Sequence, residues 1–414
     1  MLDGSDSGSL LLPNTPVDFV VFHFSQNVEK SMRRSWRYIV AVFILTSLAC
    51  SQAPPGKGAG EVELSQQANT SFRIETVVSG LQVPWSIVWA PDGRMIFTER
   101  VGRLRVVENG KLRMQPLFTV PDVEPSGESG LMSVALHPQF ASNHFIYLSY
   151  AYGGDGVRVR VARYKETPSG LVDQKVIIEN IPAAQFHAGC RLRFGSDGKL
   201  YVTTGDATQR TLAQRLDSLA GKTLRLNDDG TVPTDNPFVG QQDARPEIWS
   251  YGHRNSQGMD WQPGTNLMFQ TEHGPSGFDG SPGGDEVNIV EKGKNYGWPT
   301  IDHRETHAGM ESPLLEYTPA CAPASGMFYR GAAFPQFTGN FFFGCLRGER
   351  LIRVVLDGRR VISQEDLLAK KYGRIRDVAQ GPDGLLYFST SNRDGRGNPA
   401  SDDDRIIRLA PVKP

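Results

Sequence analysis

The first residues that could do chemistry are a histidine and an aspartate on either side of a short predicted hairpin. His187 lies just before the strand pattern at residues 191–194, and Asp206 follows the next one at residues 200–203. If these strands pair, the two side chains meet at the same end of the hairpin. A carboxylate beside an imidazole fixes its tautomer and supports its basicity, as a general base requires. The alternative is an ordinary loop histidine and a turn aspartate.

Four arginines and an asparagine flank other predicted strands in a similar way. They are Arg254, Asn255, Arg347, Arg374 and Arg376. If the fold brings these positions together, the arginines suit an anionic ligand with several carboxylates, held by forked hydrogen bonds. The alternative is a set of separate arginines that cover apolar surface at the rim.

A third candidate is a possible cation site at residues 272–275, where the sequence reads Glu-His-Gly-Pro. Backbone carbonyls of Gly274 and Pro275 could point inward, and hard cations such as calcium take oxygen ligands of this kind. A plain turn is the alternative.

The elements that must position these residues repeat along the chain. Six times, an alternating apolar strand is followed by a turn, often Asp-Gly, and a second apolar strand; the units begin near residues 86, 132, 191, 258, 326 and 376. Such alternation predicts hairpins, and hairpins repeated at this spacing predict a propeller. We therefore predict an all-β fold, a six-bladed β-propeller of four-stranded antiparallel blades. A large β-sandwich and a β-helix are the alternatives.

Two further details follow from the pattern. Residues 72–78 are expected to pair with residues 405–409 and so close the ring, and the best helix candidate, residues 211–219, is short.

Composition limits the class of function. The 414 residues include 44 Lys and Arg and 45 Asp and Glu, so the net charge is -1. No strong field exists to hold nucleic acid or an anionic membrane, and neither is expected as a partner. Four cysteines without a Cys-x-x-Cys pair exclude a disulfide scaffold and a zinc knuckle.

The N-terminal region has the pattern of an export signal. Residues 32–50 contain arginines, a short apolar stretch and a final cysteine, which together predict a signal peptide. We predict residues 1–31 to be a misannotated or disordered extension, residues 51–70 a flexible linker and residues 71–414 the propeller. The protein is then expected in the periplasm or cell envelope.

Cysteine positions add two expectations. Cys50 could carry a lipid after cleavage, which would anchor the protein to a membrane; simple secretion is the alternative. In an oxidising compartment Cys321 and Cys345 could pair.

Eight short segments follow one another along the chain. They are VPW at 83–85, SLAGK at 218–222, DNPF at 235–238, YGHRNSQG at 251–258, EHGP at 272–275, GDEVN at 284–288, NYGWP at 295–299 and RIRDV at 374–378. Together they resemble the soluble pyrroloquinoline quinone (PQQ) dependent aldose sugar dehydrogenases, the glucose/sorbosone dehydrogenase family. The resemblance runs from about residue 83 to residue 409.

That resemblance implies an enzyme that uses PQQ and calcium to oxidise aldose sugars at the anomeric carbon to lactones and passes the electrons to an external acceptor. It implies His187 as the general base, oriented by Asp206. The cofactor contacts that it implies are Arg254 and Asn255 at the quinone, Arg347, Arg374 and Arg376 at the carboxylates, and the carbonyls of Gly274 and Pro275 at calcium.

The sequence departs from that family at three places. Glu128 stands where Gln often contacts the cofactor, and a carboxylate there would repel an anionic cofactor unless protonated or metal-bound. Arg347 stands where Lys is familiar, and residues 276–284 form a longer loop that could reshape the substrate entrance.

Two other functions fit a propeller. A calcium-dependent lactonase would need carboxylate and Asn side chains converging on the channel and no arginine cluster. A non-catalytic propeller that binds glycans or proteins would need no His187–Asp206 pair.

Overall fold

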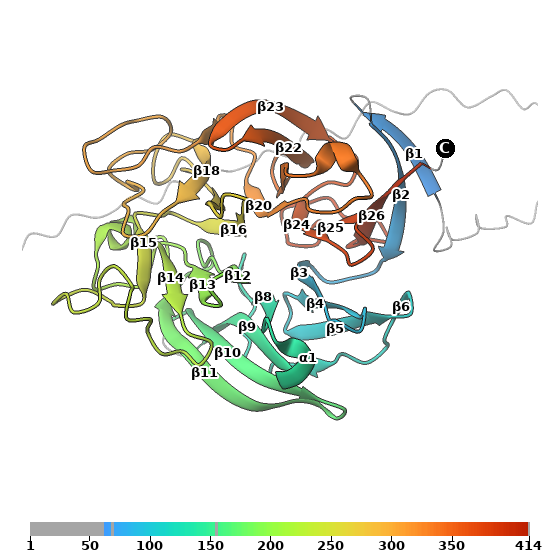
Figure 1. The fold of residues 1–414 in the computed structure, drawn as a ribbon, viewed down its shortest axis with the longest axis horizontal. Coiled ribbons are helices and arrows are strands. Elements are labelled where there is room, and N and C mark those ends of the chain that lie inside the picture. Colours follow the sequence, from blue (N-terminus) through green and yellow to red (C-terminus); the bar gives the residue numbers. More distant parts are fainter. Residues whose placement is uncertain (1–61, 68–69, 154–155, 413–414) are drawn as a thin grey trace, which may run out of the picture. The chain divides into compact units, whose positions relative to one another are not determined.

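Six antiparallel sheets form a closed ring in the computed structural model, which describes residues 62–67, 70–153 and 156–412 (Figure 1). The first sheet after residue 80 contains β3 (Pro84–Trp89), β4 (Met95–Glu99), β5 (Arg103–Glu108), β6 (Lys111–Leu112) and β7 (Phe118–Thr119). The second contains β8 (Leu131–Leu136), β9 (Phe145–Tyr152), β10 (Arg158–Thr167) and β11 (Gly170–Pro182). The third contains β12 (Leu192–Phe194), β13 (Leu200–Thr203), β14 (Lys222–Leu226) and β15 (Ile248–Tyr251).

The other three sheets continue the ring in chain order. The fourth contains β16 (Ser256–Trp261), β17 (Met268–Glu272), β18 (Asp285–Val290) and β19 (Leu315–Tyr317). The fifth contains β20 (Pro323–Phe328), β21 (Phe341–Cys345), β22 (Arg350–Asp357) and β23 (Arg360–Leu367). The sixth contains β24 (Ile375–Gln380), β25 (Leu386–Thr390), β26 (Ile406–Pro411), β2 (Thr70–Val78) and β1 (Val62–Gln67).

The predicted six-bladed propeller is therefore confirmed. Each predicted hairpin is the inner pair of one blade, from β3 and β4 to β24 and β25. The ring closes as predicted, because β2 pairs with β26 and places Ile74 opposite Leu409. Two sheets carry a fifth strand, and one of these, β1, lies within the segment 51–70 predicted as a linker. Residues 1–61, including the predicted signal peptide and Cys50, lie outside the described residues.

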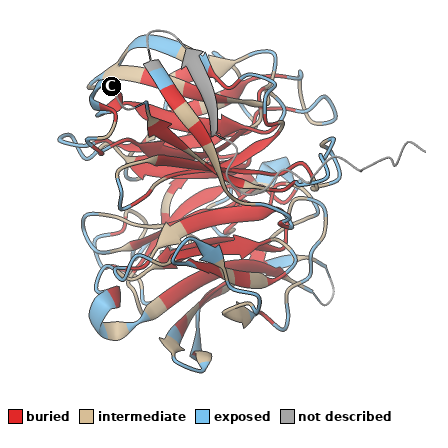
Figure 2. Cartoon of the chain, turned by 90° about the vertical axis from the view of Figure 1, so that its right-hand side faces the viewer, coloured by how far each residue is buried: buried red, intermediate tan, exposed pale blue. Residues whose placement is uncertain are grey.

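The core consists of apolar clusters between neighbouring sheets. For example, Tyr201 of the third sheet packs with Met259 and Val290 of the fourth. Since each sheet has a neighbour on both faces, an inner strand can be buried at every position, as β4 and β21 are. Figure 2 shows buried residues running along the strands and exposed ones gathered in the loops.

Helical structure is limited to short turns in the described part of the chain. These are α1 (Phe140–Asn143), the 3-10 turn η1 (Arg210–Gln214) and the 3-10 turn η2 (Pro335–Phe337). The helix expected at residues 211–219 is thus only the turn η1. The Leu212 and Ala213 carbonyls accept hydrogen bonds from the Lys222 ammonium at 2.8 and 3.0 Å, and the chain leaves η1 in an extended conformation.

Two further observations concern the cysteines and membrane-spanning helices. Cys321 and Cys345, which could pair by sequence, are buried free thiols. No helix among the described residues is long and apolar enough to cross a membrane.

Candidate active site

The loops at one mouth of the ring enclose a cavity of about 520 Å³. In each blade the inner strand begins, and the second strand ends, at this mouth, because the two strands are antiparallel. The cavity is lined by residues next to strands of five different blades, and they are Glu128, Phe186, His187, Arg254, His273, Gly274, Ser276, Phe278, Asp285, Ala320, Ala322, Leu346, Arg347, Arg374 and Arg396. Propeller topology thus brings together side chains that are distant in the sequence.

His187 and Asp206 form the hydrogen-bonded pair that the hairpin predicts. The imidazole Nδ1 lies 2.7 Å from Asp206 Oδ1, and both side chains are buried. Asp206 is itself held, because Oδ2 accepts a hydrogen bond from Trp298 Nε1 at 2.8 Å and Oδ1 accepts one from the Thr208 backbone at 2.8 Å. A carboxylate fixed in this way keeps the proton on Nδ1 and leaves Nε2 as the basic nitrogen.

Close backbone packing sets the position of His187. A Cβ atom on Gly205 would lie 1.9 Å from the His187 carbonyl oxygen, so only glycine fits beside it. His187 itself adopts a left-handed conformation with φ of 58°. The loop before β12 and the segment after β13 are therefore in direct contact, which holds the imidazole beside its carboxylate.

The Arg254 guanidinium makes three hydrogen bonds within the protein. Its Nε donates to Asp279 Oδ2 at 2.8 Å, Nη1 donates to the His273 carbonyl at 3.1 Å, and Nη2 donates to Ser276 Oγ at 3.1 Å. The group has five N–H donors, so one on each terminal nitrogen is left for a ligand. The guanidinium also lies over the Trp298 ring, 5.4 Å from its centroid.

Glu128 forms an ion pair with Arg396 that sequence analysis did not predict. Its Oε1 lies 2.9 Å from Arg396 Nη1, while Oε2 lies 3.5 Å from Asn255 Nδ2. Burial raises the pKa of Glu128, but the surrounding positive charges, including those of Arg396 and Arg376, outweigh burial and hold the pKa below its usual value. The carboxylate is therefore ionised and paired with Arg396.

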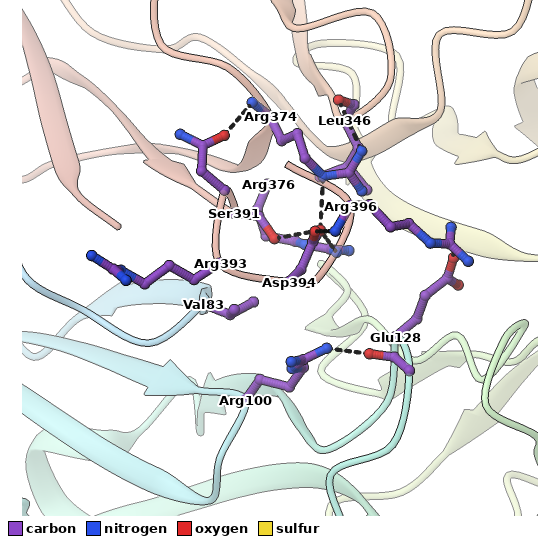
Figure 3. A network of polar contacts seen from close by, with 12 residues as sticks. Val83, Arg100, Glu128, Leu346, Arg374, Arg376, Ser391, Arg393, Asp394 and Arg396 are labelled. Carbon is purple, nitrogen blue, oxygen red and sulfur yellow. Dashed lines mark hydrogen bonds and ion pairs between the residues drawn. The ribbon is translucent and has the colours of Figure 1, made fainter. Parts of the chain in front are cut away.

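Arg374 and Arg376 share one carboxylate, Asp394, at the centre of the network in Figure 3. Arg374 Nε lies 2.8 Å from Asp394 Oδ2, and Arg376 Nη2 lies 3.8 Å from the same oxygen. Arg376 is buried, and burial lowers its pKa to about 10. Its Nε has no hydrogen-bond partner among the described residues. Two guanidinium groups thus face one carboxylate and keep an excess of positive charge.

Arg347 follows β21 and lines the cavity as an exposed side chain. Its backbone N–H donates to the Cys321 carbonyl at 3.0 Å. Its guanidinium makes no hydrogen bond or ion pair with any residue that the structure describes. All five of its donors are available to a ligand.

The carbonyls predicted to bind calcium lie at the same mouth. The Gly274 N–H donates to Asp285 Oδ1 at 2.8 Å, which fixes the segment, and the Pro275 carbonyl accepts a bond from the Gly283 N–H at 3.2 Å. One lone pair of that carbonyl remains. Burial raises the pKa of Asp285, which also lines the cavity. Among the described residues no group of three or more His, Cys, Asp or Glu side chains could hold a metal ion.

The predicted site residues divide into two groups. Those on the cavity wall are Glu128, His187, Arg254, Gly274, Arg347 and Arg374. The others are not on the wall: Asp206 is hydrogen-bonded to His187 and Asn255 to Glu128, Pro275 follows Gly274 in the chain, and Arg376 shares Asp394 with Arg374.

Sequence analysis missed several wall residues, notably His273, Phe278 and Arg396. Burial, together with the charge of Arg254, lowers the pKa of His273 to about 3 despite the carboxylate of Glu128, so its ring is neutral. Its Nε2 is buried without a partner among the described residues. The available signal was that Arg396 lies in the segment that follows β25, the second strand of its blade, as Asp206 lies in the segment that follows β13.

Comparisons with known proteins show which proteins this chain is similar to. The family model described as glucose/sorbosone dehydrogenase matches residues 81–407. An aldose sugar dehydrogenase from Escherichia coli is 38% identical over 348 residues, which cover 79% of this chain and 92% of that protein. Quinoprotein glucose dehydrogenase B from Acinetobacter calcoaceticus is 30% identical over 442 aligned positions, covering 83% and 90%.

A solved structure extends the comparison to three dimensions. The PQQ-bound form of an aldose sugar dehydrogenase from Streptomyces coelicolor superposes with a TM-score of 0.73 at 32% identity. The match covers 86% of this chain and 99% of that one.

Proposed function

The chain belongs to the glucose/sorbosone dehydrogenase family of oxidoreductases, and from this premise we propose that its cavity binds PQQ and calcium and oxidises an aldose at the anomeric carbon. One observation carries the proposal. His187, which is paired with Asp206, lies on the wall of a cavity that four arginines also line. The sugar is oxidised to its lactone, and an external acceptor takes the electrons.

The residues present fit a cofactor with three carboxylates. Arg347 offers a guanidinium without a partner among the described residues, and Arg374 lines the same cavity. Arg376 adds a buried positive charge behind them. Two buried nitrogens, His273 Nε2 and Arg376 Nε, have no partner in the part of the chain that the structure describes. Such groups are unusual in a folded protein, which supports a polar ligand that completes their hydrogen bonding.

The carbonyl oxygens of Gly274 and Pro275 are the calcium ligands in this proposal. Oxygen ligands are what calcium prefers, and bound cofactor oxygens would complete the set. When bound, PQQ supplies a quinone that accepts two electrons as hydride, and calcium supplies a Lewis acid that polarises a carbonyl oxygen.

The residues of the chain then have separate tasks. The proton of the anomeric hydroxyl passes to His187 Nε2, while the hydrogen on the same carbon leaves with its electron pair, so that the aldose becomes a lactone. Asp206 holds the tautomer with Nδ1 protonated and stabilises the imidazolium that forms. Arg254 directs its two unused N–H groups toward developing negative charge.

Reconstitution of purified protein tests the function. We expect dye reduction with aldoses to require both PQQ and calcium. His187→Ala should bind PQQ with unchanged affinity and lose about 10²- to 10⁴-fold in kcat, because only the proton acceptor is removed. His307→Ala, at an exposed histidine, serves as the control. Near-full activity of His187→Ala would refute the base assignment.

We also propose export to the cell envelope, which rests on the signal-peptide pattern at residues 32–50. The mature N-terminus, measured by mass spectrometry on protein from its native host, should begin at or just after Cys50. An added lipid mass on Cys50 would support the membrane anchor, and an unmodified N-terminus would support simple secretion. A mature protein that keeps residues 1–49 would contradict export.

A further inference from the structure

The loop at residues 276–284 exposes an aromatic ring whose position the fold does not require. Phe278 is 66% exposed, and among the described residues it is the one exposed aromatic ring. It nevertheless lines the cavity that holds His187. An exposed large apolar side chain inside a polar cavity is the kind of group that contacts ligand.

Phe278 lies directly beside the proposed base. Its ring centroid is 5.9 Å from that of the His187 imidazole, and the two rings are nearly parallel, with an angle of 27° between their planes. The aromatic face and the imidazole therefore bound the same part of the cavity. A ligand in this cavity that contacts the Phe278 ring is therefore also close to His187.

The next residue holds this ring in place. Asp279 Oδ2 accepts the Arg254 Nε hydrogen bond at 2.8 Å, and Oδ1 accepts one from the Ser276 N–H at 2.9 Å. The Asp279 carbonyl accepts a third bond from Arg210 Nη1 at 3.1 Å. Because these contacts lead to two other segments of the mouth, the loop is fastened to the cavity wall on both sides of Phe278.

Sugar rings have a surface that matches an aromatic face. A pyranose carries axial C–H bonds on its faces and most hydroxyls around its edge, so one face can pack on an aromatic ring while the edge remains free to hydrogen-bond. Resting on the function proposed above, we propose that Phe278 is the aromatic wall of the sugar site. An aldopyranose packs one C–H face on this ring and directs its anomeric hydroxyl to His187.

Kinetics of the PQQ- and calcium-loaded enzyme test this role. Phe278→Ala should raise KM for D-glucose about tenfold and change kcat by less than about threefold, because packing is lost while the proton acceptor remains. Phe278→Trp should restore a KM close to that of the wild type. Ile362→Ala removes an exposed apolar side chain of another blade, 51% exposed, and should change neither constant.

Two kinetic outcomes would overturn the proposal. One is an unchanged KM in Phe278→Ala. The other is a lower KM, which would mean that the ring obstructs the sugar. Absorbance titration with PQQ should give the same affinity in all variants, and an affinity lost in Phe278→Ala would assign the ring to the cofactor and also overturn the proposal.

A binding measurement provides a readout that does not depend on turnover. The probe is 1,5-anhydro-D-glucitol, which lacks the anomeric hydroxyl and cannot be oxidised there. Saturation-transfer NMR with irradiation of aromatic protons should mark the ring protons on one face of this sugar in the wild type and Phe278→Trp. The signal should fall by more than half in Phe278→Ala, and equal signals in all three would overturn the inference.

The two proposals can fail separately. If the loaded wild type oxidises no aldose, the proposed function fails, whatever the NMR signal shows. If the wild type oxidises aldoses and Phe278→Ala behaves like it in both assays, only the aromatic wall fails.

Discussion

Two histidine–carboxylate pairs lie at the same mouth of the ring, in neighbouring blades. His187 pairs with Asp206 and His253 pairs with Glu272, and each pair joins residues 19 positions apart. The distances from Nδ1 to the carboxylate oxygen are 2.7 and 2.8 Å. In sequence spacing and in this hydrogen bond the two pairs are alike.

They differ at the second ring nitrogen. His253 Nε2 lies 2.8 Å from Ser250 Oγ, its ring stacks on Tyr296 with centroids 4.7 Å apart, and the side chain is fully buried. His187 lines the cavity, and its Nε2 makes no hydrogen bond with any residue that the structure describes. A base therefore needs an uncommitted nitrogen at a cavity as well as a carboxylate, whereas a fully bonded pair only stabilises the fold.

The largest expected effect is on the cavity pair. Asp206→Asn replaces an acceptor with a group that can donate, so His187 should take the other tautomer and lose its basic Nε2. We expect kcat for aldose oxidation to fall by about 10³-fold, with PQQ affinity unchanged. Steady-state dye reduction at saturating PQQ and calcium measures it. A loss below about tenfold would remove the distinction between the two pairs.

The interior pair should respond in stability instead. His253→Ala removes one of the three hydrogen-bond partners of the buried Glu272 carboxylate and opens a cavity beside Tyr296. We expect the free energy of unfolding to fall by about 3 kcal/mol. Chemical denaturation measures the change, with the exposed His307→Ala as the control. A cost below about 1 kcal/mol would show that the buried pair does not stabilise the blade.

The same contrast shows what the sequence could predict. The hairpins were predictable because alternation is local, and the His187–Asp206 pair followed because both ends of a hairpin meet. Sequence could not predict that Nε2 of His187 is left without a hydrogen bond while Nε2 of His253 has one. That difference depends on which groups lie nearby in space, such as Ser250 and Tyr296 beside His253. Arg396 could have been found by position after its strand.

Other features were beyond sequence reasoning. Phe278 lies in a loop without any periodic pattern, and its position depends on the Asp279–Arg254 contact between segments 25 residues apart. The polar strand β1 pairs with β2 at the edge of the sixth sheet. In both cases the structure depends on contacts that no local pattern encodes.

Buried carboxylates also affect how the stability of the protein depends on pH. Asp404 is buried beside backbone N–H groups of Val83 and Asn392, and burial raises its pKa to about 6. The folded state then holds a proton that the unfolded state releases near its ordinary value, so this carboxylate lowers stability as pH rises from about 4 to about 6. In Asp404→Asn that part of the pH dependence is absent.

We therefore expect the free energy of unfolding of the wild type, measured relative to that of Asp404→Asn, to fall as pH rises through this window, by up to about 1.4 kcal/mol per pH unit. Denaturant titrations at several pH values from 4 to 7 measure the free energy of unfolding of both proteins. A difference that stays constant would mean that Asp404 titrates alike in the folded and unfolded states.

The smallest effect concerns Glu128, a carboxylate that faces the cavity and is paired with Arg396. Because its pKa is held below the usual value, it is charged at neutral pH and repels an anionic cofactor. Glu128→Gln should tighten PQQ binding about two- to fivefold, since solvent and Arg396 screen most of the repulsion. The gain should persist through neutral pH and disappear in acid, where the wild-type carboxyl is protonated.

Absorbance titration with PQQ at several pH values measures this gain, and Glu124→Gln, an exposed glutamate of the same loop, is the matched control. Weaker binding in Glu128→Gln would mean that the carboxylate contacts the cofactor favourably or through bound calcium. Glu128 would then be bonded to specific partners in the loaded enzyme, as Glu272 is in the interior. A position at the cavity would no longer distinguish a carboxylate that acts on ligands from one that only holds the structure together.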